Sequence, residues 1–462
     1  MAWETGTAAN HRDLMNRLVT FLSTNASLVA ASQNWEVLRA PVALPFTATA
    51  PNGRIAFGTQ QLPSTTPDGW PSEIIVDPCR LKVTATLNAP SSGTYLFTFY
   101  HGDWLELRID GALVLGAYFT NITGTFATSG TSTVSLTLSS GNHNIDIRLI
   151  SRAGPTDRRG IGFGWRKPGD ASPSIVPAAN LSDLAIEWGY NPAANFQGTT
   201  GTAQNFATAM LDQECALKGP GASGTDEIFV NLYTTSGFSA DTFNMIVRGA
   251  TGFSDTAVMY DQPGRSSYDA AMLLWEQPIT YWFIANGRRF IVIAKVSTTY
   301  ESAYAGLGLP YGLPTEFPYM LVIGTSSSDA EFRFSDTSTA HTSFWRPGLA
   351  SNSTDSPTCL QMRDTAGVWQ KFTNLGSANG WVYPTNATSM HVERPAPDGS
   401  YALTPLVLFN ATNVYGELDG VYHVSGFGNA SENTITIEGQ DYLVVQGANG
   451  TTAVDYAAIK LE

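Results

Sequence analysis

The sequence predicts a mainly β protein with one helical segment near its N-terminus. Short runs of β-branched and aromatic residues recur along most of the chain, and Gly, Pro, Asn and Asp separate them, as is typical of strands joined by turns. Charged residues make up only 14% of the 462 residues, so Ser, Thr, Asn and Gly must supply most of the surface polarity. Hydrophobic residues make up 43%, which is enough for a large core.

Residues 11–23 are predicted to form an amphipathic helix. Four apolar side chains fall on one face of it, at i, i+4, i+7 and i+8: Leu14, Leu18, Phe21 and Leu22. Asn10 is a suitable N-cap, and Asp13 lies near the positive end of the helix. A short turn at residues 26–32 precedes the next strand. We assign residues 1–40 to the main body of the protein, as its N-terminal helical segment.

Residues 41–175 are predicted to form a separate β-sandwich. The segment opens with a stretch rich in Pro, Ala, Thr and Gly, and residues 169–177 form a linker at its other end. Between them lie short strand-like runs, at residues 81–87, 93–99, 104–111, 134–138 and 141–149. Short strands at regular spacing, with Gly turns and few helix signals, are typical of a β-sandwich.

The order of these strands resembles the PA14 family. The family pattern is a G-x-Y-x-F strand, a D-x-x-x-L-x-I-D-G hairpin, an L-x-x-G-x-H-x-I-x-I hairpin and a closing Trp. The matching residues are Gly93, Tyr95 and Phe97, then Asp103, Leu107, Ile109, Asp110 and Gly111, then Leu138, Gly141, His143, Ile145 and Ile147, then Trp165. The resemblance covers residues 76–168 and implies a carbohydrate-associated β-sandwich.

The resemblance also suggests where a glycan would bind. Some PA14 domains are calcium-dependent lectins that hold the metal with two adjacent aspartates, because a hard cation prefers oxygen ligands. Here Gly102 precedes Asp103, so the calcium-binding pair is incomplete and we expect no cofactor, with calcium as the alternative that the resemblance leaves open. The candidate carbohydrate-binding residues are Tyr100, Asp103, Trp104 and Tyr118.

Two other polar positions in this segment are predicted to be structural. Asp110-Gly111 is a common turn dipeptide. His143, near the start of a hairpin, is expected to make a structural hydrogen bond instead of binding a metal. The six histidines of the chain are scattered without metal-ligand spacing, so we expect no metal site.

Residues 176–462 are predicted to form a larger β-rich (α+β) body. Two apolar runs, 281–284 and 290–293, flank Asn286-Gly287, which predicts a hairpin whose mirror-image turn has positive φ at both central residues. Both runs are apolar throughout instead of alternating, which indicates central strands covered on both faces. Further strands are expected at residues 228–233, 241–247, 319–323, 401–409, 420–424, 434–437 and 441–445, and residues 205–215 form a short helix or strand.

Parts of this body resemble tail proteins of tailed bacteriophages. The opening residues Trp3 to Leu22 carry one part of the resemblance. The other part runs from Lys218 through Val230, the 282–319 segment and residues 332–336. The resemblance implies a virion protein in which the PA14-like sandwich is inserted between the N-terminal helix and the body.

Charge and composition limit the partners. The formal net charge is −14 and no Lys/Arg run occurs, so nucleic acid is not an expected partner. The longest apolar stretch is broken at residues 286–289, far short of the roughly 20 residues that cross a bilayer. No basic segment followed by an apolar one opens the chain, so we expect synthesis in the host cytoplasm. The three cysteines form no pattern and are expected to be reduced.

No nucleophile elbow, metalloprotease motif or nucleotide-binding loop occurs in the sequence. Glycoside cleavage needs two carboxyl groups about 5–9 Å apart, and these can come from distant strands. Asp226/Glu227 and Glu417/Asp419 are the nearest candidates in the sequence. Each lies near a glycine, where acidic residues usually shape turns. We therefore predict that the chain is not an enzyme.

The leading functional hypothesis is a structural protein of a phage tail tip or baseplate, located in the virion tail. It would contact other tail proteins and further copies of itself around the tail axis, and its sandwich would contact a neighbouring subunit or the host surface, for instance a surface glycan. One alternative is a free carbohydrate-binding protein with the sandwich as its working part. A second alternative is a glycan depolymerase.

Overall fold

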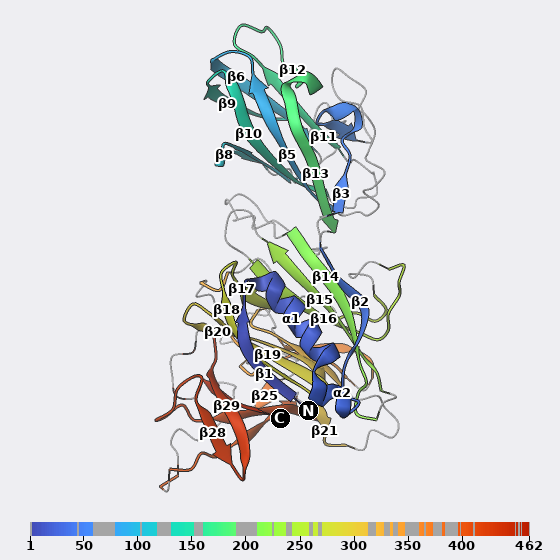
Figure 1. Cartoon of the computed structure of the whole chain (residues 1–462), viewed down its shortest axis with the longest axis vertical. Coiled ribbons are helices and arrows are strands. Elements are labelled where there is room, and N and C mark those ends of the chain that lie inside the picture. The colour runs from blue at the N-terminus through green and yellow to red at the C-terminus, as the bar shows by residue number, and fades with distance from the viewer. Residues whose placement is uncertain are drawn as a thin grey trace. The chain divides into compact units, whose positions relative to one another are not determined.

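The computed structural model describes most of the chain. The described residues are 2–43, 46–58, 79–101, 104–117, 131–151, 160–190, 210–223, 226–236, 243–257, 262–266, 270–312, 320–327, 333–335, 341–346, 360–364, 366–372, 381–383, 396–397, 399–409, 412–448, 450, 453 and 455–461. They form two compact units: Met1–Ala43 with Ala203–Glu462, and Leu44–Thr202. We call the first the body and the second the sandwich (Figure 1).

The predicted fold class is confirmed: the protein is mainly β, with an N-terminal helix, and every strand pairing in the described residues is antiparallel. Among its described residues, the body contains three sheets. The central sheet has the order β1 (Ala2–Ala8), β18 (Ile279–Ala285), β19 (Arg289–Val296), β20 (Thr299–Leu307), β22 (Leu321–Gly324), β23 (Leu360–Arg363) and β24 (Trp369–Phe372). The β14 sheet has the order β17 (Ala270–Leu274), β16 (Phe243–Ala250), β15 (Ile228–Ser236), β14 (Met210–Gly219) and β2 (Glu36–Ala43). The C-terminal sheet has the order β25 (Trp381–Tyr383), β26 (Thr404–Phe409), β27 (Val414–Val424), β30 (Tyr456–Lys460), β29 (Gln440–Gln446) and β28 (Thr434–Ile437), and β21 (Leu309–Pro310) also pairs with β27.

The central sheet is covered on both faces, as the apolar runs predict. On one face, Phe283 of β18 and Val292 of β19 join a core that includes residues of the β14 sheet such as Leu232. On the other face, Ile284 and Ile291 join a core with residues of the C-terminal sheet. Since side chains alternate along a strand, each strand contributes to both cores. The body is therefore three sheet layers with the central sheet in the middle.

The predicted N-terminal helix is present as α1 (His11–Thr24), followed by the short helix α2 (Ala26–Ala30). The Asn10 side chain caps α1 by accepting hydrogen bonds from the backbone N–H groups of Arg12 and Asp13, 3.0 Å each. The apolar stripe, which includes Leu14, Leu18 and Phe21, is buried in the core between the central and β14 sheets. Within the described residues, no helix has the length and apolar character that crossing a bilayer requires.

The β18–β19 hairpin is present, but the predicted mirror-image turn is wrong. Neither Asn286 nor Gly287 has a positive φ. Instead, the Asn286 side-chain oxygen accepts hydrogen bonds from the backbone N–H groups of Arg288 (2.8 Å) and Arg289 (3.0 Å). The Asn286 backbone oxygen also accepts the indole N–H of Trp35 at 2.9 Å. A side-chain-capped turn held by tertiary contacts thus replaces the turn that the Asn-Gly pair favours in isolation.

The part of the sandwich that the structure describes consists of two sheets around one core. One sheet has the order β3 (Phe46–Ala48), β13 (Leu181–Tyr190), β5 (Cys79–Ala89), β10 (Gly141–Ser151), β7 (Trp104–Ile109) and β8 (Ala112–Ala117). The other has the order β12 (Ser174–Ile175), β11 (Gly160–Arg166), β6 (Gly93–His101) and β9 (Thr131–Leu138), with β4 (Ala56–Gly58) beside β11. Two short 3₁₀ turns, η1 (Pro51–Gly53) and η2 (Ala178–Asn180), accompany them. Alternate residues of both sheets, for example Val83 and Phe97, meet in the core.

The sandwich extends further along the chain than the sequence indicates. The expected boundary at residue 175 places β13 in the body, whereas β13 pairs with β5 from Leu181 to Tyr190 and belongs to the sandwich, which ends at Thr202. The alternation of β13 is hard to recognise because its pairing shifts between Ser182 and Ala185, where Asp183 has a positive φ of 54°.

Candidate functional site

Two of the four predicted carbohydrate contacts, Tyr100 and Trp104, lie where the chain passes from one sandwich sheet to the other. Tyr100 is near the end of β6, where its backbone pairs with Gly162 and Thr131. Trp104 begins β7 and pairs with Ile150. Asp103 and Tyr118 lie outside the described residues. The backbone therefore places Tyr100 and Trp104 on consecutive strands of different sheets.

A hydrogen-bonded cluster joins two turns of the sandwich. Asp110, with a φ of 52°, lies in the turn between β7 and β8, and its Oδ2 is 2.7 Å from Nδ1 of His143. Its Oδ1 accepts the backbone N–H of Asn144 at 2.9 Å. The other ring nitrogen of His143, Nε2, is 3.0 Å from the carbonyl oxygen of Ser139. The expected structural hydrogen bond of His143 and the expected turn at Asp110 are both confirmed.

This cluster favours a charged histidine. Both ring nitrogens of His143 face acceptor oxygens, so both must carry hydrogen for the two contacts to form. The hydrogen bond to Asp110 raises the pKa of His143 despite its burial, and the same hydrogen bond lowers the pKa of Asp110. The cluster therefore holds the two turns together as an ion pair.

The two acidic pairs of the body have structural partners. Asp226 accepts hydrogen bonds from the backbone N–H groups of Ala222 and Ser223, 2.7 Å each, so it shapes a turn. Its neighbour Glu227 lies 3.2 Å from the ammonium group of Lys218.

The second acidic pair connects the C-terminal sheet to other segments of the body. Glu417 accepts the hydroxyl of Tyr311 at 3.0 Å. Asp419, which is 6% exposed, lies 2.8 Å from Arg288 and 3.5 Å from the fully buried Arg289. Asp226 therefore shapes a turn and Asp419 joins the C-terminal sheet to the central sheet, while Glu227 and Glu417 each pair with one neighbouring side chain.

A buried pair of titratable groups lies elsewhere in the body. His341 Nε2 is 2.8 Å from Glu301 Oε1, and both side chains are fully buried. In the part of the chain that the structure describes, no group of three or more His, Cys, Asp or Glu side chains is arranged to hold a metal ion. Cys215 is a buried free thiol whose pKa is raised by burial.

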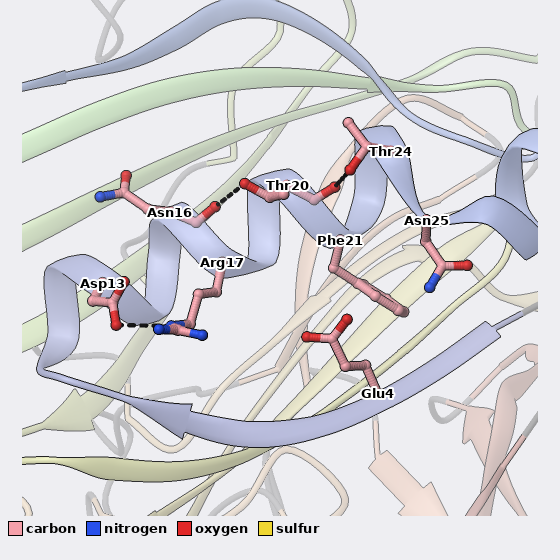
Figure 2. Close-up of a pocket in the computed structure, with 8 residues that line it drawn as sticks. All are labelled: Glu4, Asp13, Asn16, Arg17, Thr20, Phe21, Thr24 and Asn25. Carbon is pink, nitrogen blue, oxygen red and sulfur yellow. Dashed lines mark hydrogen bonds and ion pairs between the residues drawn. The ribbon is translucent and has the colours of Figure 1, made fainter.

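A polar groove lies between helix α1 and strand β1. It has a volume of about 360 Å³ and is lined by Glu4, Asp13, Asn16, Arg17, Thr20, Phe21, Thr24 and Asn25. Figure 2 shows Glu4 extending from β1 toward the helix, with Asp13 and Arg17 toward one end of the helix and Asn25 at the other. Since β1 is an edge strand of the central sheet, the groove lies at the margin of the core between the central and β14 sheets. We call it the α1–β1 groove.

Local sequence explains how the α1–β1 groove is held. Gly6 has no side chain, and a Cβ there would lie only 2.7 Å from the hydroxyl oxygen of Tyr281. The Tyr281 ring therefore lies across β1 and donates its hydroxyl to Glu4 at 2.9 Å. On the helix, Asp13 accepts the backbone N–H of Ala9 and the Nε–H of Arg17, 2.7 Å each.

The electrostatics of the α1–β1 groove follow from these contacts. The hydrogen bond to Asp13 raises the pKa of Arg17. Burial opposes ionisation of Asp13, but the hydrogen bonds from Arg17 and from the Ala9 N–H more than offset it and lower its pKa. Burial and the hydrogen bond to Glu4 raise the pKa of Tyr281. The carboxyl groups of Glu4 and Asp13 and the guanidinium of Arg17 are thus the ionisable groups that line the groove.

The sequence motifs do not reveal this groove. Asp13 is recognisable only as a residue near a helix start, and Glu4 lies in a segment without a strand-like alternation. The one available signal is the polar stripe of α1, with Asn16, Thr20 and Thr24 spaced at i, i+4 and i+8. Such a stripe normally faces water, so its position beside the edge strand could not be predicted.

Comparison with known proteins gives structural similarities only. No protein-family model matches the chain, and no curated protein matches it. An anti-sigma factor domain-containing protein is 15% identical, with a TM-score of 0.23, over 43% of this chain and 60% of its own length. A second one, from Clostridium clariflavum, is 13% identical, with a TM-score of 0.24, over 60% of this chain and 67% of its own. The PA14 domain of the MpAFP antifreeze protein is 19% identical, with a TM-score of 0.20, over 35% of this chain and 84% of its own. The chain is thus structurally similar to a PA14 domain and to anti-sigma factor domain-containing proteins, and none of these three is a tail protein.

Proposed function

We propose that the chain is a non-enzymatic structural subunit of a phage tail tip or baseplate. Its three-layer body would make the assembly contacts, with several copies arranged around the tail axis. The sandwich would contact the host cell surface or a neighbouring subunit. This proposal extends the resemblance of residues 3–22, 218–230, 282–319 and 332–336 to tail proteins.

The observation that carries the proposal is the place where the sandwich enters the body. β2 ends at Ala43, immediately before the sandwich, and β14 begins at Met210, shortly after it. These two strands pair with each other, with Ala43 opposite Gln213. The sandwich therefore interrupts a connection between two neighbouring strands, and the β14 sheet continues across the interruption. An insertion of this kind leaves the host core intact, which supports a division into an assembly body and a contact module.

The composition of the chain supports the same division. With 14% charged residues, the surface of the protein is mostly neutral and polar. Extended contacts between neighbouring subunits bury polar surface at lower cost when few isolated charges must be desolvated. Repeated copies around a symmetry axis would use the same body surfaces in each contact.

Immunogold electron microscopy of purified virions tests the proposal. Antibodies raised against the body and against the sandwich are applied separately to intact particles. The proposal expects sandwich antibodies to label the tail tip, with several gold particles on each tail, while preimmune serum does not. Absence of the chain from purified virions, established by mass spectrometry of the same preparation, would contradict it.

Two further assays distinguish the alternative functions. Binding to a glycan array that is lost in Trp104→Ala, together with absence from virions, would favour a free carbohydrate-binding protein. Release of reducing ends from host polysaccharide would favour a depolymerase. In that case the Asp226→Asn and Glu417→Gln variants would show which acidic pair is needed.

A further inference from the structure

The α1–β1 groove has the dimensions of a small-molecule site. Its volume of about 360 Å³ falls within the roughly 300–1,000 Å³ of sites that bind small ligands. Phe21, which is buried, is its one apolar lining residue, and the other seven lining residues are polar. Its walls belong to α1 and β1, and both elements bury side chains in the core between the central and β14 sheets. The groove is therefore preformed and does not depend on a loop.

Hydrogen-bonding capacity remains on both sides of the groove. Glu4 uses Oε1 for Tyr281, which leaves Oε2 as an acceptor. Asp13 uses Oδ2 for both of its hydrogen bonds, which leaves Oδ1 as an acceptor. Arg17 donates its Nε–H to Asp13 and also hydrogen-bonds Tyr281, and since a guanidinium carries five N–H groups, further N–H donors remain. Acceptors and donors therefore lie within one small groove.

The helix side of the groove adds amide donors. The side-chain oxygen of Asn16 accepts from Gln213 at 2.8 Å, which leaves its NH₂ group available. The side-chain oxygen of Asn25 accepts the backbone N–H groups of Ser27 and Leu28, so its NH₂ group is available too. Figure 2 shows Asn25 at one end of the groove, with Glu4 nearer its middle.

We propose that the α1–β1 groove binds a neutral saccharide, one or two sugar rings in size. A sugar hydroxyl donates and accepts at the same time, so it can connect a carboxylate such as Glu4 to a donor such as Arg17 or Asn25. This site is distinct from the sandwich residues Tyr100 and Trp104, and it does not depend on assembly into a virion.

Charge argues against an anionic ligand in the groove. Glu4 and Asp13 carry two negative charges against the single positive charge of Arg17, and Asp13 already pairs with that guanidinium. A phosphate or a uronate would meet a net repulsive site, because like charges within a few ångströms destabilise one another. The balance of donors and acceptors instead fits an uncharged polyol.

Saturation-transfer NMR with the full-length chain tests this proposal. The probes are maltose, lactose, cellobiose and N,N′-diacetylchitobiose, with glucuronic acid as the anionic comparison. At least one neutral disaccharide is expected to bind. Glu4→Gln keeps an acceptor for Tyr281 but replaces the second carboxylate oxygen with a donor, and it should weaken binding at least about tenfold, the loss expected from one hydrogen bond to a charged acceptor.

Two further variants make the result interpretable. Thr20→Phe fills the groove from the helix side and should abolish binding, and it keeps the proposal testable if Glu4→Gln does not fold. Glu276→Gln, an exposed Glu-to-Gln change away from the groove, should bind as the parent chain does. No binding by any of the four disaccharides, unchanged binding in both groove variants, or binding of glucuronic acid alone would each overturn the proposal. Loss of binding in Trp104→Ala but not in the groove variants would move the site to the sandwich.

Discussion

The ion pair of Asp110 and His143 makes the stability of the sandwich depend on pH. Asp110→Asn keeps an oxygen for the Asn144 N–H, and asparagine tolerates the positive φ at this position. The change removes the carboxylate that raises the pKa of His143. Because folding raises that pKa, the stabilisation is fully present below the ordinary histidine pKa of about 6.5 and is lost as the pH rises through the raised value. Since folding lowers the pKa of Asp110, its contribution is present above the ordinary aspartate pKa of about 3.9 and is lost as the pH falls through the lowered value.

The geometry sets the expected magnitude. A hydrogen bond to a charged group contributes about 1.5–3 kcal/mol when both partners are buried. His143 is 9% exposed at its side chain, but the Asp110 side chain is 53% exposed, so water screens the pair. We therefore expect Asp110→Asn to lower the free energy of unfolding of the sandwich by about 1 kcal/mol at pH 5.5, or about 2–4 °C in Tm for a domain of this size.

Calorimetry at pH 5.5 and pH 9 checks this prediction with Asp110→Asn, His143→Gln and the double variant. The loss caused by Asp110→Asn should be larger at pH 5.5 than at pH 9, and the two substitutions should be less than additive at pH 5.5. Asp170→Asn is the matched control, because Asp170 is paired with Lys167 at 3.6 Å and with no histidine. Equal losses at the two pH values, or additive effects at pH 5.5, would refute the ion-pair interpretation.

Three further predictions concern the body. Asn286→Ala should destabilise it by about 1–3 kcal/mol, because two backbone N–H groups lose their acceptor, and an unchanged urea midpoint would contradict this capping role. Glu432 accepts hydrogen bonds from Lys295 and Tyr300 at 2.5 and 2.6 Å, so Glu432→Gln should lower the urea midpoint at pH 7. This difference between variant and parent should shrink as the pH falls through the lowered pKa of Glu432. An unchanged midpoint at pH 7 would contradict a stabilising role of these two hydrogen bonds. Cys215 should react with a disulfide reagent only after unfolding, because its thiol is buried and its pKa is raised, and rapid reaction in the folded protein would count against that burial.

Much of the fold could be predicted where local pattern and tertiary environment agree. The fully apolar runs of β18 and β19 indicate strands covered on both faces, and the structure places one core on each side of them. The stripe of α1 and its cap at Asn10 likewise specify a helix with one buried face. In the hairpin and in the helix, the apolar residues that predict the element are the same residues that are buried in the core.

The features that could not be predicted depend on contacts between distant segments. Strand β1 contains Gly6 and lacks a regular apolar alternation, and it is a strand because it pairs with β18. The turn at Asn286 takes its conformation from side-chain capping and from Trp35, which lies far away in the sequence. The α1–β1 groove arises from both effects, because β1 brings Glu4 and the gap at Gly6 next to the polar stripe of α1.

The central claim is that the sandwich is a module inserted between two paired strands of a self-sufficient body, and one deletion tests it most directly. Removing residues 44–202 joins Ala43 to Ala203 and leaves residues 203–212 to connect Ala43 with its partner Gln213. Calorimetry of the shortened chain should show one cooperative transition, within about 2 °C of the body transition of the full chain, because less than about 1 kcal/mol of body stability should depend on the sandwich. A shortened chain that lacks a cooperative transition, or that aggregates on expression while the full chain is folded, would contradict the account.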